Sequence, residues 1–89
     1  MSEIKVERPT QEKLKSLGIE HWSKWECEPS VFDWQYSGNE TAYVFEGHVI
    51  VETASGKTEI KGGDLVHFPD GLKCKWHVKE KIKKVYTFK

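Results

Sequence analysis

The sequence has no long apolar segment and no excess of charge of either sign. Its apolar runs extend over a few residues, whereas a helix that crosses a bilayer needs about 20. The 14 basic side chains are balanced by 14 acidic ones, so no net positive field attracts nucleic acid or an anionic membrane. We therefore expect neither a membrane nor a nucleic acid as a partner.

Cysteine is scarce, and the N-terminus lacks the features of a signal peptide. The two cysteines, Cys27 and Cys74, form neither a CxxC pair nor a zinc-finger spacing. Reducing compartments disfavour a disulfide between them, and each is most simply a small buried apolar residue. Residues 1–7 alternate between charged and apolar types, unlike the apolar core of a secretion signal. These features predict a cytoplasmic protein.

The chain is short, and its 89 residues allow a single domain. Residues 1–20 are expected to form an N-terminal extension with a short edge strand and a short helix. Thr10 can cap the start of that helix and Gly18 can end it, which leaves two turns at most. No further helix is expected, and residues 21–89 are predicted to form a β-barrel.

From residue 19 onward, apolar residues recur with a period close to two, which is typical of strands. Turn-forming residues separate these segments at intervals of about 8–12 residues, as in β-sandwiches and barrels. Strands are expected at residues 24–28, 32–36, 43–45, 48–53, 65–68, 72–78 and 82–88. Gly47 marks a position where the chain is expected to reverse, because reversals often need positive φ or close backbone approach. The sequence predicts an all-β fold with a short N-terminal helical segment.

Two separated segments carry a pair of motifs: residues 40–47, ETAYVFEG, and residues 63–74, GDLVHFPDGLKC. In order and spacing they resemble the paired motifs of the cupin superfamily. Residues 32–36, FDWQY, taken together with these motifs, are similar to the (S)-ureidoglycine aminohydrolase-like group within that superfamily. The resemblance implies a cupin double-stranded β-helix, which is a jelly-roll-like barrel, and it implies a homodimer.

Cupins usually hold a metal through histidines, but this sequence has none at the corresponding motif positions. The first motif can be aligned on Glu40 in two ways, and neither places a histidine at a ligand position. In the second motif, Cys74 stands where cupins have a histidine. Hard oxygen ligands combined with one soft sulfur are unusual for a metal site. We expect no cofactor, and we expect His48 and His67 at the surface or rim rather than in a displaced metal site. If a divalent metal does bind, its predicted ligands are Asp33, Gln35, Glu40 and Cys74.

Aromatic residues alternate along one predicted strand, where Phe32, Trp34 and Tyr36 share a face. Each ring buries about 150–250 Å². At about 25 cal/mol per Å², the free energy gained by burying the rings is larger than any gained by burying an unpaired Asp33 instead. The rings are expected either to line a pocket inside the barrel or to face outward beneath the N-terminal segment or a second subunit. In the first case the predicted pocket residues are Trp34, Tyr36, Glu40, Phe68, Cys74 and Trp76.

Lysines are concentrated near the C-terminus of the chain. They include Lys73, Lys75, Lys79, Lys81, Lys83 and Lys84. Because the chain has no net charge and no base-stacking motif, we interpret them as a solvated outer face that discourages pairing between sheet edges.

Three functions are compatible with these features. The favoured one is the binding of a small polar metabolite in an aromatic-lined barrel pocket that lacks the usual histidine metal site. The family resemblance permits a metal-dependent enzyme that acts on a small nitrogenous or carboxylated metabolite, with Glu40 and Cys74 among the metal ligands. The third is a structural or interaction module. The sequence assigns no catalytic residue, and it does not establish that a reaction is catalysed.

Overall fold

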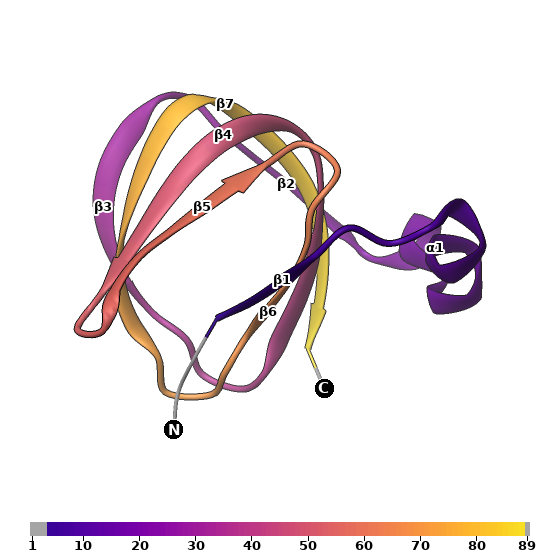
Figure 1. Cartoon of the computed structure of the whole chain (residues 1–89), viewed down its shortest axis with the longest axis horizontal. Coiled ribbons are helices and arrows are strands. Elements are labelled where there is room, and N and C mark those ends of the chain that lie inside the picture. The colour runs from indigo at the N-terminus through magenta and orange to yellow at the C-terminus, as the bar shows by residue number, and fades with distance from the viewer. Residues whose placement is uncertain (1–3, 89) are drawn as a thin grey trace.

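The computed structural model describes residues 4–88, which form an antiparallel sheet curled into a barrel with one short helix at its side (Figure 1). The all-β architecture expected from the sequence is confirmed. In chain order the elements are β1 (Lys5–Glu7), α1 (Gln11–Leu17), the 3₁₀ turn η1 (Ile19–His21), β2 (Ser23–Cys27), β3 (Ser30–Gln35), β4 (Glu40–Thr53), β5 (Gly56–Lys61), β6 (Leu65–Phe68) and β7 (Lys73–Phe88). Neither helical segment within residues 4–88 has the length and apolar character of a bilayer span.

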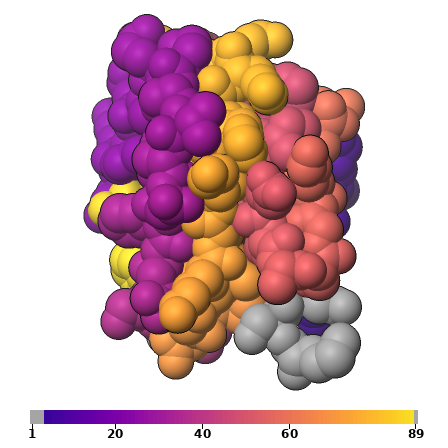
Figure 2. Space-filling view, turned by 90° about the vertical axis from the view of Figure 1, so that its left-hand side faces the viewer, coloured from indigo at the N-terminus to yellow at the C-terminus, as the bar shows by residue number. Residues whose placement is uncertain are grey.

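Two long strands, β4 and β7, form the spine of the barrel. They pair with each other along most of their length. On its other edge, each pairs with one strand in its first half and with a different strand in its second half. β4 pairs first with β6 and then with β5, while β7 pairs first with β3 and then with β2. The space-filling view shows β7 on the outer wall between the β2–β3 segment and the β4–β5 hairpin (Figure 2). Segments far apart in the sequence therefore surround one interior.

Gly47 lies where the pairing of β4 with β7 changes register. Between the pairs Glu46–Lys83 and His48–Glu80, this one residue of β4 is opposite two residues of β7. Gly47 has a φ of +113°, and a Cβ atom there would lie 2.5 Å from a backbone oxygen of β7. The chain reversal expected at Gly47 is therefore wrong, because a bulge bends both strands while their pairing continues. The strands predicted separately on either side of the bulge are continuous.

The interior is filled by alternate residues of the strands. On β7 the inward positions include Cys74, Trp76, Val78, Ile82 and Lys84, all of them buried. Apolar side chains of the neighbouring strands complete the core, among them Val44, Val49, Val51, Ile60, Val66 and Phe68. Lys84 is therefore a charged residue at a position that the alternation of β7 directs into the barrel.

Helix α1 begins and ends where the sequence predicts. The Thr10 hydroxyl accepts a hydrogen bond from the backbone N–H of Lys13 at 3.2 Å. Gly18 adopts a left-handed φ of +69°, and its N–H donates to the carbonyl of Lys15. The prediction of no further helix is wrong in one respect, because Gly18 also caps the start of the short η1 turn.

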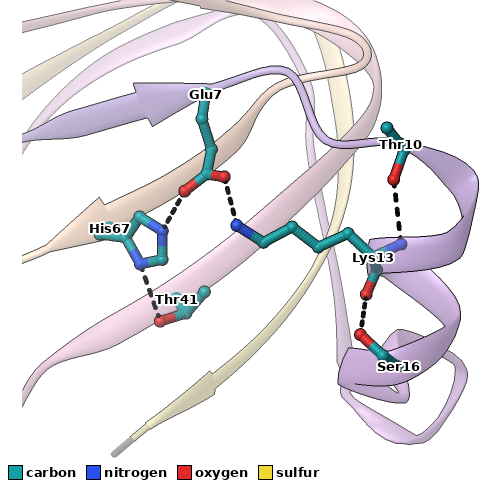
Figure 3. A network of polar contacts seen from close by, with 6 residues as sticks. All are labelled: Glu7, Thr10, Lys13, Ser16, Thr41 and His67. Atoms are coloured by element: carbon teal, nitrogen blue, oxygen red, sulfur yellow. Dashed lines mark hydrogen bonds and ion pairs between the residues drawn. The ribbon is translucent and has the colours of Figure 1, made fainter.

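A polar network connects α1 to the sheet (Figure 3). Lys13 Nζ donates to the Glu7 carboxylate at 2.6 Å, and His67 Nε2 lies 2.9 Å from the other carboxylate oxygen. His67 Nδ1 in turn contacts the Thr41 hydroxyl at 3.3 Å. The hydrogen bond from Lys13, followed by that from His67, lowers the pKa of Glu7. Because β1 also pairs with β6, the N-terminal segment belongs to the same sheet as the rest of the barrel.

Glu7→Gln should destabilise the protein modestly, in a way that depends on pH. A carboxyl whose pKa is lowered by folding stabilises the native state at any pH above its ordinary pKa of 4.5. This stabilisation is lost as the pH falls through the lower pKa of the folded state. Since the Glu7 side chain is 39% exposed to water, we expect a loss below about 1 kcal/mol at neutral pH. Urea unfolding at neutral and strongly acidic pH measures it. A difference that persists unchanged in acid would contradict the role given to the carboxylate.

Candidate ligand-binding site

A cavity of about 250 Å³ opens between β2, β3 and the C-terminal part of β7. Most of the side chains around it are aromatic. β2 contributes Trp25, β3 contributes Phe32 and Trp34, the following loop contributes Tyr36, β4 contributes Glu40, and β7 contributes Trp76, Lys84, Tyr86 and Phe88. The lining is therefore apolar apart from a few polar groups, of which Glu40 and Lys84 carry charge.

The aromatic rings pack against one another and fix the walls of the cavity. The rings of Phe32 and Trp76 are stacked with centroids 6.0 Å apart, and Trp25 meets Trp76 edge-on at 5.8 Å. Tyr36 stacks on the core residue Phe68 at 4.6 Å. Contacts of these kinds are favourable beyond the area that they bury, so they hold the rings in one arrangement.

A buried ion pair forms part of the wall. Lys84 Nζ donates to Glu40 Oε2 at 2.8 Å, and each side chain is only 6% exposed. Glu40 pairs with Phe88 across the β4–β7 ladder, so the long Lys84 side chain reaches it along the inner face of the sheet. Taking two charges out of water is costly, and the short hydrogen bond offsets part of that cost.

Four aromatic rings surround the Lys84 ammonium. Its Nζ atom lies 5.0 Å from the ring centroids of Trp25 and Trp76, 5.5 Å from that of Tyr86 and 5.8 Å from that of Phe68. The electron-rich faces of such rings attract a cation. Burial nevertheless lowers the pKa of Lys84, while the Glu40 carboxylate acts in the opposite direction. The cavity thus contains an amine whose uncharged form is easier to reach than in water.

The indole nitrogen of Trp76 is a further polar group at this place. Among residues 4–88 it is the buried side-chain nitrogen or oxygen atom that has no hydrogen-bond partner. Burial raises the pKa of the Tyr36 hydroxyl and of the Cys74 thiol, and the nearby indole opposes the shift in both. The indole N–H is not placed to donate a hydrogen bond to either group. Buried donors are normally paired, so this unpaired indole N–H is an exception in the wall of the cavity.

The residues predicted to form a pocket divide between two depressions and the core. Those that line the cavity are Trp34, Tyr36, Glu40 and Trp76. Phe68 lies in the core behind Tyr36. Cys74 borders a second, more open depression of about 640 Å³ together with Asp33 and Gln35, and its thiol approaches the Trp34 carbonyl at 3.6 Å. Trp34 lies at the rim, is 52% exposed and borders both depressions.

Lys84 corrects the interpretation of the C-terminal lysines as one solvated face. Its side chain is buried, whereas the neighbouring Lys83 side chain is 43% exposed and lies 3.7 Å from Glu46. A signal for this was present in the sequence, since the inward positions of the last strand alternate as Ile82, Lys84, Tyr86 and Phe88. Trp25, Tyr86 and Phe88 were not predicted as lining residues, and Phe32 was predicted to share the face of Trp34 and Tyr36 but was left out of the predicted pocket.

The residues named as possible metal ligands do not fit a common metal site. Asp33 and Gln35 are exposed, Cys74 is buried, and the Glu40 carboxylate is bound to the ammonium of Lys84. In the part of the chain that the structure describes, no group of three or more His, Cys, Asp and Glu side chains is placed to hold a metal ion. The four side chains therefore do not come together as one set of metal ligands.

The three histidines that lie on strands are engaged in separate pairs with glutamates. His48 Nε2 lies 2.8 Å from Glu59, His67 Nε2 lies 2.9 Å from Glu7, and His77 Nε2 lies 3.1 Å from Glu52. All three are partly exposed. The alternative of a displaced metal site at His48 and His67 is not supported by this arrangement, because each ring contacts a different carboxylate on a different strand pair.

Comparison with known proteins identifies relatives of this barrel. The EutQ-like cupin domain family matches residues 14–86. The crystal structure of a DUF861 family protein from Thermotoga maritima is 52% identical, with a TM-score of 0.95 over 98% of this chain and 100% of that one. A search of curated proteins gave no match.

More distant structures share the barrel. The EutQ protein of Clostridium difficile is 25% identical, with a TM-score of 0.65 over 71% of this chain and 50% of its own. A putative ethanolamine utilization protein Q from Salmonella typhimurium is 18% identical, with a TM-score of 0.64 over 93% of this chain and 66% of its own. At that identity the second likeness concerns the fold alone.

Proposed function

Since this chain belongs to the EutQ-like cupin domain family, we propose that its barrel binds a small polar molecule in the cavity beside Lys84 and Glu40. The observation that carries this proposal is the buried ion pair within an aromatic wall. Well-packed apolar side chains often stabilise a core as well as a buried ion pair does, so stability alone does not explain the pair. Small-molecule sites, in contrast, are typically apolar cavities with a few directed polar groups.

The size and charge of the cavity limit the class of ligand. Its volume of about 250 Å³ is just below the range of roughly 300–1,000 Å³ for pockets that hold drug-sized molecules. Lys84 supplies donors and Glu40 supplies an acceptor, while the pair as a whole is neutral. Trp34 and the other rings offer flat apolar surface. We therefore propose a small ligand of zero net charge that has both polar groups and apolar surface.

A thermal-shift screen of small polar metabolites tests this function. At a free concentration ten times Kd, a ligand adds about 1.4 kcal/mol of stability, which raises Tm by roughly 6–11 °C for a chain of this size. Trp34→Ala removes the rim ring but leaves the ion pair, and it should greatly reduce the shift. Lys83→Met, on the outer face, should retain it. A shift of equal size in wild type and Trp34→Ala would exclude this cavity as the site.

The similarity to the ureidoglycine aminohydrolase-like group stays a prediction, as does the metal-dependent reaction that it would permit. Within residues 4–88, Lys84 occupies the Glu40 carboxylate that a metal would need, which argues against that reaction. Elemental analysis of untagged protein checks this alternative. We expect no stoichiometric metal, whereas one equivalent that Glu40→Ala removes would favour the enzyme over simple binding.

A homodimer and a cytoplasmic location also stay predictions. Several large apolar side chains are exposed on the surface, namely Val6, Val31, Trp34, Phe45 and Phe88. A second copy of the chain could remove some of them from water. Light scattering on the purified protein gives the mass directly, and we expect that of a dimer.

A further inference from the structure

We propose that Lys84 is a reactive amine that captures small uncharged aldehydes or ketones as imines inside the cavity. This inference rests on the proposed binding function and adds a covalent step to it. Lys84 lines the cavity, and its Nζ atom lies 2.8 Å from the Glu40 carboxylate. A nucleophile in hydrogen-bond contact with a base is the usual arrangement of covalent catalysis.

The surroundings of Lys84 make the unprotonated amine, which such chemistry requires, easier to form than it is in water. The side chain is 6% exposed, and the rings of Trp25 and Trp76 lie 5.0 Å from Nζ. Removal from water lowers the pKa of the amine, and this effect exceeds the opposing one of Glu40. Desolvation in an apolar pocket is one of the established ways in which proteins activate a lysine.

The step is balanced by the two side chains and the carbonyl compound alone. Glu40 takes one proton from the Lys84 ammonium, and the amine attacks the carbonyl carbon, which forms a C–N bond and moves an electron pair to oxygen. That oxygen receives a second proton from nitrogen and then the proton held by Glu40. It leaves as water while the C=N bond forms. An ammonium and a carbonyl compound thus become an iminium and water, without an oxidant or a reductant.

The charges at the site select uncharged carbonyl compounds. The iminium keeps one positive charge beside Glu40, and the surrounding rings still face a cation. A carboxylate on the substrate would bring a second negative charge close to Glu40. Among the described side chains that line the cavity, Lys84 is the sole cation, so this second charge would have no partner.

Reductive trapping with propanal and sodium cyanoborohydride tests the proposal, because the reductant converts an imine into a stable amine. Intact mass spectrometry counts the propyl groups, and peptide mapping locates them. At limiting propanal we expect one group, on Lys84, before the exposed lysines react. The adduct should be absent in Lys84→Met and retained in Lys83→Met. Glu40→Gln should slow its formation roughly a hundredfold through loss of proton transfer. Pyruvate, which carries a carboxylate, should be trapped far less than propanal.

The mapping in the unaltered protein decides the outcome, because it does not depend on a variant that alters stability. Labelling spread over exposed lysines such as Lys83, with Lys84 unmodified, would overturn the proposal. If small neutral ligands still raise Tm in that case, binding in the cavity stands and the imine chemistry alone fails. If neither thermal shifts nor an adduct at Lys84 are found, both fail.

Discussion

Replacing Gly47 by alanine should destabilise the barrel by about 3 kcal/mol or more. Two costs add at this position. The φ of +113° is unfavourable for any residue with a Cβ atom, and that atom would lie 2.5 Å from the Lys81 carbonyl oxygen and 2.6 Å from the Ile82 Cα. Both are backbone atoms of β7, so rotation of a side chain cannot relieve the contact. Urea unfolding of the variant and the wild type measures the loss.

Two other glycines separate the two costs and serve as controls. Gly56 has a φ of +138°, but an added Cβ meets no atom within 4 Å, so Gly56→Ala reports backbone strain alone, at about 1 kcal/mol. Gly62 has no positive φ, yet its Cβ would lie 2.9 Å from the Phe45 carbonyl oxygen, so Gly62→Ala reports the contact, at about 1–3 kcal/mol. The loss at Gly47 should exceed each of these. Equal losses at Gly47 and Gly56 would show that β4 and β7 are not closely packed at the bulge.

Lys84→Met should destabilise the protein by about 3–5 kcal/mol, although methionine retains an unbranched side chain of similar reach. The reason is that the Glu40 carboxylate would remain 6% exposed without its partner. Lys83→Met makes the same substitution at the next position, where the side chain is 43% exposed. There we expect a change within about 0.5 kcal/mol. Equal effects of the two substitutions on urea unfolding would show that Lys84 is as well solvated as Lys83.

The local elements of this fold could be predicted because their causes lie within a few residues. Thr10 caps α1 through a hydrogen bond to Lys13, and Gly18 ends it through its own left-handed backbone. The resemblance of residues 40–47 and 63–74 to the paired cupin motifs implied the cupin architecture, which is confirmed.

The partners of the long strands could not be predicted in the same way. The bulge at Gly47 depends on a close approach to β7, which no local pattern around the glycine specifies. Alternation along β7 directs Lys84 inward and Lys83 outward, but the carboxylate that pairs with Lys84 comes from Glu40, 44 positions earlier in the chain. Composition indicated a solvated lysine cluster, whereas the alternation of the strand indicated an inward Lys84. In this barrel, alternation was the better guide.

The aromatic site was predicted in kind but not in membership. Trp34, Tyr36 and Trp76 come from segments whose alternation made them candidates for a pocket, and all three line the cavity. Trp25 and Phe32 join them because β2 and β3 both pair with β7, which places their rings around Trp76. Such convergence of separate strands follows from the topology and is not visible in any single segment.

A double-mutant cycle between Lys84 and Glu40 tests the central claim, which is that these two side chains form a buried ion pair at the cavity wall. The cycle combines Lys84→Met and Glu40→Gln and compares the free energies of urea unfolding of the four proteins. We predict a coupling energy of at least about 1.5 kcal/mol, because the second substitution removes the charge that the first leaves unpaired. Losses that add to within about 0.5 kcal/mol would contradict the pair and, with it, the site built around it.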